Sequence, residues 1–323
     1  MKLIYKSSRE EEKVIQKPLN RGRIVASTLD QSRRETLLRV DLLDSYKDFF
    51  GFREIPFSVS PDPKFFYFSH SHAEALNHLR YGIYEGLGFT MITGEPGTGK
   101  TMLLRYFLSK VGEDLRITHI YDPRLPQKEL LLALLESSGE SKLPPGELSE
   151  RKLTEKLYEL LLLAHRQSKK VVILLDEAQG LDFESLEGLR FLSNLETENQ
   201  KLIQIVLLGQ AELEEKLQEK SLRQLDQRIL VRYYLLPLEL EEIQPYIQHQ
   251  LMVAKVDSHV EFTPQSANKI YEISRGLPRM VNAICERAMM SAFIENTKKI
   301  SVQNVLEGWE SLNGIKILER RRL

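Results

Sequence analysis

The stretch Gly94-Glu95-Pro96-Gly97-Thr98-Gly99-Lys100-Thr101 matches the pattern GxxxxGK(S/T) of a phosphate-binding P-loop. It follows a short apolar run at 89–93 that predicts a strand, and it precedes a stretch at 100–110 that predicts a helix. The glycines let the backbone wrap tightly, so that successive N–H groups point at phosphate oxygens, and the helix N-terminus adds its positive end. Lys100 is expected to reach the β- and γ-phosphates, and the Thr101 hydroxyl to ligate Mg²⁺. The stretch therefore predicts a site for a nucleoside triphosphate and Mg²⁺.

A second motif follows five apolar residues, Val-Val-Ile-Leu-Leu at 171–175, which predict a buried strand. The run ends in two acids, Asp176 and Glu177. Asp176 would hold Mg²⁺ through its water shell, and Glu177 would polarise the attacking water as a general base. An acid directly after the magnesium Asp is typical of P-loop proteins in which a further strand separates the P-loop strand from the Asp strand. Residues 204–208 offer that strand.

Four more polar side chains could act on the γ-phosphate. Gln210 follows the 204–208 strand and could contact the phosphate or position water, or it could be a satisfied loop amide. Arg223 and Arg228 lie five residues apart near a short predicted helix, on different faces. Either could be an arginine finger inserted by a neighbouring subunit, or a surface arginine. Arg279 starts a predicted helix and could fold back onto the nucleotide or point into solvent.

The predicted site comprises three groups of residues. Those expected to bind the nucleotide are Gly94, Glu95, Pro96, Gly97, Thr98, Gly99, Lys100, Thr101, Met102 and Asp176. Those expected to take part in catalysis are Glu177, Gln210, Arg223, Arg228 and Arg279, and the expected metal ligands are Thr101 and Asp176.

The order of apolar runs predicts two folded domains. From 89 to 236 strands alternate with helices, which predicts a parallel sheet of five strands covered by helices on both faces. After Pro237 the pattern is helical only. We predict an N-terminal extension, an α/β domain, a helical domain and a basic tail, at 1–45, 46–237, 238–312 and 313–323 respectively.

The residues before the first strand are of two kinds. The extension mixes both charges and has few aromatics, so we expect it to be partly disordered or to bind a partner. Leucines at 37–43 could form a short amphipathic helix that either docks a partner or packs on its own domain. Aromatics alternate with prolines at 49–68, which is too apolar for a linker and predicts a segment folded against the α/β domain. Its aromatic side chains could form hydrophobic walls for the base of the nucleotide, or they could only pack in the protein core. His70 and His72 lack metal-ligand partners, and a contact with the base is the alternative to packing.

Composition excludes several classes of protein. Lys+Arg (45) nearly balances Asp+Glu (46), so no global field draws the molecule to nucleic acid or anionic lipid, although a local patch could. The single cysteine, Cys285, excludes an internal disulfide and fits a reducing compartment. No apolar run approaches the ~18–20 residues of a membrane helix, and the N-terminus lacks the apolar core of a signal peptide. We expect a cytoplasmic protein that could dock on an inner-membrane complex.

Together these residues resemble the ExeA/GspA-type AAA+ ATPases of bacterial envelope assembly, from about 46 to 293. The strings that carry the resemblance, besides the P-loop, lie at 49–57, 61–63, 81–83, 176–179, 189–197, 208–213, 222–229 and 276–279. It implies an AAA+ fold with a helical lid, and ATP hydrolysis with Mg²⁺ at subunit interfaces of a homo-oligomer, with six protomers expected. It also implies roles for Lys100 at the phosphates, Thr101 and Asp176 at magnesium, Glu177 at water, Arg228 in trans and Arg279 in the lid.

The sequence departs from the secretion members of this family at both ends. Those members begin close to the Phe-Phe-Gly segment, whereas about 45 residues precede it here. Those proteins continue into a membrane helix and a peptidoglycan-binding domain, whereas this sequence ends at Leu323, so we expect a soluble member without them. Three functions are then compatible with the sequence. The first is that of an oligomeric ATPase that serves secretion, type IV pilus assembly or exopolysaccharide export through a protein partner. The second is an ATPase resembling TnsC or MuB that assembles on duplex DNA and recruits a transposase. The third is a nucleotide-gated scaffold with negligible turnover.

Overall fold

The computed structural model describes residues 45–58, 60, 62–120, 126–137, 149–254 and 260–314, and the structural statements below concern these residues. Nearly all of the predicted N-terminal extension, with the expected helix at 37–43, and most of the predicted basic tail lie outside them. The elements described here belong to one compact unit of the chain, Tyr46–Leu323.

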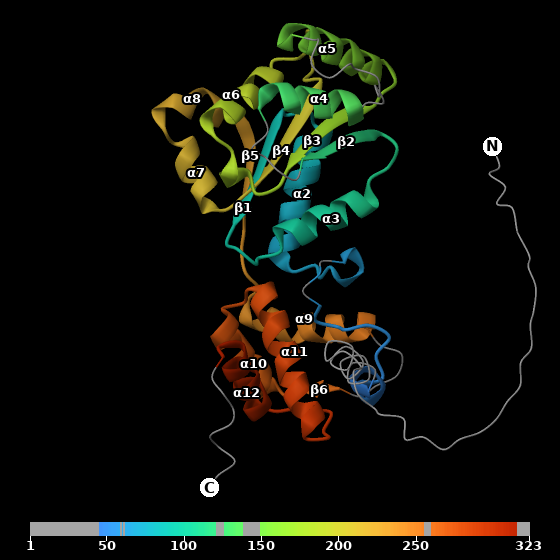
Figure 1. The fold of residues 1–323 in the computed structure, drawn as a ribbon, viewed down its shortest axis with the longest axis vertical. Helices are drawn as coiled ribbons and strands as arrows, with labels where there is room; N and C mark the ends of the chain where they lie inside the picture. Colours follow the sequence, from blue (N-terminus) through green and yellow to red (C-terminus); the bar gives the residue numbers. More distant parts are fainter. Residues whose placement is uncertain are drawn as a thin grey trace, which may run out of the picture. The chain divides into compact units, whose positions relative to one another are not determined.

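A parallel sheet of five strands forms the centre of the α/β part (Figure 1). The strands are β1 (Phe89–Gly94), β2 (Leu115–Ile120), β3 (Lys170–Leu175), β4 (Ile203–Leu208) and β5 (Ile229–Leu235). Their order is β2-β3-β4-β1-β5, so β4 separates the P-loop strand from the Asp strand, as predicted. The register pairs Ile92 with Leu208 and Leu175 with Leu207. The carboxyl ends of β1, β3 and β4 therefore meet at one edge, which brings their motifs together.

Helices cover both faces of this sheet because alternate residues of each strand point to opposite sides. Ile173 and Leu175 lie in one apolar cluster, and Val172 and Leu174 in another. The first cluster includes α4 (Gln127–Ser137), α5 (Glu150–Arg166), α6 (Phe183–Leu192), α7 (Ala211–Leu217) and α8 (Arg223–Asp226). The second includes α2 (His70–Tyr84) and α3 (Lys100–Lys110). The predicted α/β class, with helices on both faces, is confirmed.

The C-terminal part is helical, with one departure from expectation. Its helices are α9 (Leu240–Ala254), α10 (Pro264–Ser274), α11 (Pro278–Ile294) and α12 (Val302–Leu312). Two short strands, β6 (Glu261–Phe262) and β7 (Lys299–Ile300), pair in parallel, whereas only helices were predicted after Pro237. Two-residue strands are too short to show a period of two, so the pattern missed them. No helix in the described part of the chain is long and apolar enough to cross a membrane.

The aromatic segment packs differently from the prediction. Tyr46, Phe50, Phe52 and Phe57, together with Phe65 of the short η1 (Pro63–Phe65), lie in the apolar cluster of α9–α12 rather than against the sheet. The next ring along the chain, at position 66, instead stacks on a tyrosine of α3, with centroids 4.4 Å apart. Tyr67 returns to the helical cluster, where its ring lies 5.5 Å from that of Tyr246 in α9. Consecutive aromatic residues of this segment therefore pack on both cores.

Candidate nucleotide site

The P-loop connects β1 to α3 through a backbone that requires glycine. Gly97 and Gly99 have φ of 89° and 102°, in the left-handed region that other residues avoid. A Cβ on Gly97 would lie 3.2 Å from the Cβ of Arg279, and one on Gly99 would lie 2.8 Å from Nε2 of His72. These two glycines therefore serve both the turn of the loop and the close approach of its neighbours.

Lys100 is buried at the start of α3 and bonds to the loop itself. Its Nζ donates to the carbonyl oxygens of Gly94 at 2.7 Å and Glu95 at 2.9 Å, while the Thr98 hydroxyl donates to the latter at 2.8 Å. Burial lowers the pKa of Lys100, and the nearby acids, Glu177 first among them, act in the opposite direction. The ammonium is thus placed inside the loop, where phosphate oxygens would be its natural acceptors.

Thr101 and Asp176 meet where the P-loop faces the end of β3. The Thr101 hydroxyl donates to Oδ2 of Asp176 at 2.9 Å, and Oδ1 of Asp176 accepts the main-chain N–H of Glu177 at 2.9 Å. The described residues contain no group of three or more His, Cys, Asp or Glu side chains arranged to hold a metal ion. A hydroxyl and one carboxylate fit Mg²⁺, which keeps several waters and shares its coordination with phosphates. These two residues would hold that ion.

Glu177 stands in a strained turn directly after β3. Its φ of 53° is left-handed, a conformation that costs energy for a residue with a side chain and that is common at functional sites. Its Oε2 accepts the side-chain amide of Gln179 at 2.5 Å and that of Gln210 at 3.4 Å. In turn, Oε1 of Gln179 accepts the main-chain N–H of Gln210 at 3.1 Å. Sequence reasoning missed Gln179, whose one signal was its position two residues after Glu177.

A cleft of about 460 Å³ lies over these groups, between the P-loop and the helical part. Arg279 lines it at the start of α11 and donates its main-chain N–H to Gly97 O at 3.2 Å. Phe65, Phe66 and Tyr67 also line the cleft. The sequence-predicted residues that line the cleft are Pro96, Gly97, Gly99, Lys100, Thr101, Met102, Glu177, Gln210 and Arg279. Its apolar wall and polar floor suit a nucleotide, with the base against the rings and the phosphates on the loop.

His72 is buried and forms a hydrogen bond with the P-loop. It is only 5% exposed, and its Nε2 lies 3.0 Å from the carbonyl oxygen of Thr98. Since a carbonyl only accepts, Nε2 carries the proton, and Nδ1 accepts the hydroxyl of Ser69 at 2.6 Å. Burial lowers the pKa of His72 to about 4, which keeps the ring neutral. With both nitrogens occupied, His72 ties α2 to the loop.

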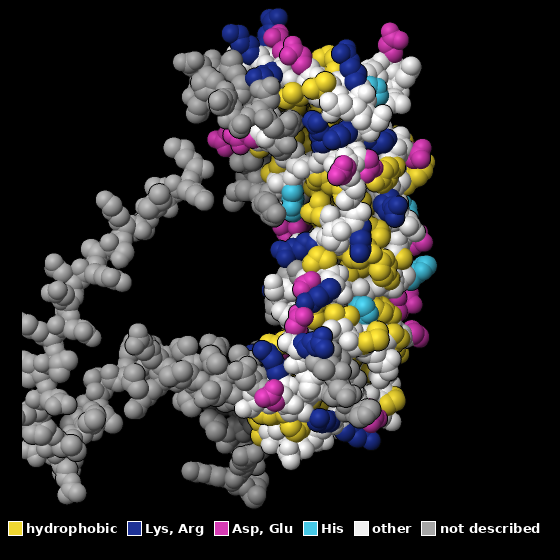
Figure 2. Space-filling model, turned by 90° about the vertical axis from the view of Figure 1, so that its right-hand side faces the viewer, with side chains coloured by type: hydrophobic (Ala, Val, Ile, Leu, Met, Phe, Trp, Pro, Cys, Tyr) yellow, Lys and Arg dark blue, Asp and Glu magenta, His cyan; other side chains and the backbone are white. Residues whose placement is uncertain are grey.

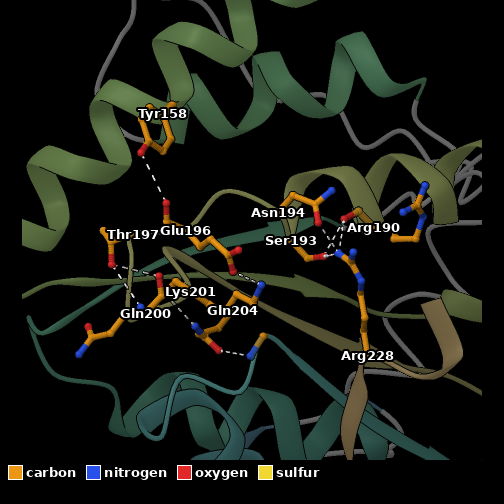
Figure 3. A network of polar contacts seen from close by, with 11 residues as sticks. Tyr158, Arg190, Ser193, Asn194, Glu196, Thr197, Gln200, Lys201, Gln204 and Arg228 are labelled. Atoms are coloured by element: carbon orange, nitrogen blue, oxygen red, sulfur yellow. Dashed lines mark hydrogen bonds and ion pairs between the residues drawn. The ribbon is translucent and has the colours of Figure 1, made fainter. Parts of the chain in front are cut away.

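The two candidate arginine fingers do not line this cleft. Arg228 is half-buried, and its Nη1 donates to Ser193 Oγ at 2.7 Å, Asn194 Oδ1 at 2.6 Å and Arg190 O at 3.2 Å (Figure 3). These acceptors lie at the C-terminal end of α6, where free carbonyl oxygens favour a cation. Arg223 is exposed at the start of α8. Within one chain, the described lining of the cleft therefore includes neither Arg223 nor Arg228.

Comparisons with known proteins agree with this geometry. A family model described as AAA domain matches residues 83–217. General secretion pathway protein A of Aeromonas hydrophila is 42% identical over 272 residues, which are 84% of this chain and 49% of that protein, so the chain spans about half of its relative's length.

Two solved structures share the fold at low identity. The ORC1 protein of Aeropyrum pernix, solved in complex with DNA, has a TM-score of 0.58 at 18% identity, covering 81% of this chain and 70% of that one. Cdc6p from Pyrobaculum aerophilum has a TM-score of 0.57 at 19% identity, covering 74% and 66%.

Proposed function

This chain belongs to the AAA+ ATPases and is related to general secretion pathway protein A, and we propose that it hydrolyses ATP with Mg²⁺ in the cleft above its P-loop. The observation that carries the proposal is the convergence of Thr101, Asp176 and Glu177 beside the buried Lys100. These residues come from two strand ends, and together they supply a phosphate cation, metal ligands and a base.

Each residue then has a definite task. The N–H groups of the P-loop and Lys100 hold the β- and γ-phosphates, and Thr101 and Asp176 hold the metal. Mg²⁺, when bound, would supply positive charge that offsets the negative charge of the phosphates. Glu177 accepts a proton from the water that attacks the γ-phosphate, and Gln210 contacts that phosphate or water. Arg279 reaches the phosphates from α11 and links nucleotide state to the helical domain.

The Glu177→Gln variant tests this proposal. The amide keeps the shape of the side chain but cannot accept the proton, so phosphate release should fall about 10²- to 10⁴-fold while ATP still binds. Glu241→Gln is the matched control, because this acid is exposed in the first turn of α9 and should leave turnover unchanged. If Glu177→Gln releases phosphate at the wild-type rate, Glu177 is not the base and the chain is better described as a nucleotide-gated scaffold.

We further propose that the active form is a homo-oligomer, a ring of six protomers, in which a neighbouring subunit completes each site. The absence of Arg223 and Arg228 from the described lining of the cleft supports this. Arg228 is engaged by its own α6, whereas Arg223 is exposed. The family resemblance implies Arg228 as the trans-acting finger. Because Arg228 is engaged and Arg223 is exposed, we assign this role to Arg223 instead.

The work of this ATPase is proposed to serve a bacterial envelope assembly, such as secretion, pilus or exopolysaccharide export, through a protein partner and from the cytoplasmic side of the inner membrane. The relationship to general secretion pathway protein A supports this role. On the face shown in Figure 2, Lys and Arg side chains are interspersed with Asp and Glu. Among the described residues on that face (Figure 2), the basic side chains form no continuous track for a DNA backbone, so the DNA-associated role gains no support from them.

A further inference from the structure

Gln179 contacts the proposed base and its neighbour at the same time. It lies in η2 (Ala178–Gly180), the single turn after Glu177. Its Nε2 donates to Oε2 of Glu177 at 2.5 Å, and its Oε1 accepts the main-chain N–H of Gln210 at 3.1 Å. A Cβ on Gly209 would lie 3.2 Å from that Oε1, so glycine at this position leaves room for the amide. Both ends of the amide are therefore used, which fixes its orientation.

The main chain of Gln179 is held as firmly as its side chain. Lys216 of α7 donates from Nζ to the carbonyl oxygens of Gln179 and Leu181, each at 2.7 Å. These are charge-assisted hydrogen bonds, which are stronger than those between neutral groups. The turn that carries Glu177 is thus bonded both to Gln210, at the junction of β4 and α7, and to Lys216, in the last turn of α7.

We propose that Gln179 is a positioning residue that holds the Glu177 carboxylate in its reactive orientation and couples it to Gln210. Both amide donors use the same oxygen, Oε2, so neither contact occupies Oε1, the oxygen available to take a proton from water. A displacement of Gln210 by a γ-phosphate would be passed through Gln179 to the base. This inference rests on the proposed role of Glu177 and adds a residue whose effect is exerted through it.

The test replaces the amide by an apolar group of similar size, Gln179→Leu. Loss of a hydrogen bond to a charged group should lower kcat about 10- to 100-fold. KM and the affinity for ATP should stay at wild-type values, because Gln179 is not among the described residues that line the cleft. Steady-state phosphate release and equilibrium nucleotide binding measure the two quantities. Gln248→Leu, at an exposed position of α9, is the matched control and should change neither.

A second background separates positioning from a merely structural role. In the Glu177→Gln protein there is no base to orient, so adding Gln179→Leu should leave the residual turnover unchanged. If it lowers that turnover by the same factor as in the wild type, or if Gln179→Leu alone keeps the wild-type kcat, the proposal is overturned. Failure of the underlying function looks different, because Glu177→Gln would then itself be fully active.

Discussion

At the scale of single residues, His72 shows how a neutral buried side chain can shape a phosphate site. The ring is held between Ser69 and the carbonyl of Thr98, with Gly99 close against it. The hydrogen bond from Nε2 thus links α2 to the P-loop two residues before Lys100. His72→Gln would keep an N–H donor for the carbonyl oxygen of Thr98. His72→Phe would leave this buried carbonyl without that hydrogen bond.

His72 also makes stability depend on pH. Because burial lowers its pKa from the usual 6.5 to about 4, the unfolded chain binds a proton in this interval that the folded chain does not. The free energy of unfolding should fall as pH drops from 6.5 toward 4, by about 1.4 kcal/mol per pH unit from this group. Denaturant titrations of wild type and His72→Gln measure the difference. Parallel pH profiles for the two proteins would show that His72 does not titrate in this way.

At the scale of elements, Arg228 connects the segment between α8 and β5 to the end of α6. Figure 3 shows its guanidinium among the last residues of that helix, near a small hairpin in which Glu196 pairs with Lys201. The hairpin in turn contacts β4, since Gln204 donates to the carbonyl of Lys201 and accepts the N–H of Gly88. Arg228 therefore connects the end of α6 to the start of β5, and Gln204 connects β4 to the start of β1.

Arg228→Ala should therefore destabilise the fold. The side-chain and main-chain acceptors at the end of α6 would lose a charged donor, at a cost of about 1–3 kcal/mol. Urea unfolding should show a lower midpoint with an unchanged slope. Arg223→Ala, on an exposed side chain of the same region, should stay within about 0.5 kcal/mol of wild type. An Arg228→Ala protein as stable as the Arg223→Ala protein would contradict the capping role.

At the scale of the whole molecule, the cleft joins two parts that an assembly could use. The P-loop joins β1 to α3 in the α/β part, and Arg279 lies at the start of α11 in the helical part. The two meet where the main-chain N–H of Arg279 donates to the carbonyl oxygen of Gly97. A nucleotide bound between them would change the contacts between the two parts. An arginine of a neighbouring subunit that contacts the γ-phosphate would make those contacts depend on whether the nucleotide is ATP or ADP.

Mixing two inactive variants tests this arrangement. Lys100→Ala removes phosphate binding but keeps the arginines, and Arg223→Ala keeps the cleft but removes the proposed finger. Mixed oligomers should recover part of the lost ATPase activity, since some interfaces combine an intact cleft with an intact arginine. No recovery in mixtures whose co-assembly is verified would argue against action in trans. Recovery with Arg228→Ala, together with a fully active Arg223→Ala protein, would move the role to Arg228.

The sequence by itself determined the features that depend on residues within a few positions of one another. The P-loop and the Asp176-Glu177 strand end are of this kind. The position of β4 between β1 and β3 also followed, because Glu177 marks that arrangement.

Only the tertiary structure decided which side chains meet across the fold. His72 reaches a carbonyl 26 residues away, Gln179 an N–H 31 residues away and Arg228 a hydroxyl 35 residues away. The rings of the 46–65 segment likewise joined helices that begin at Leu240. Apolar periodicity says that a face is buried but not against what, and polar partners at strand ends carry no period at all. Their contacts exist because the sheet register aligns those ends, which is a property of the packed molecule.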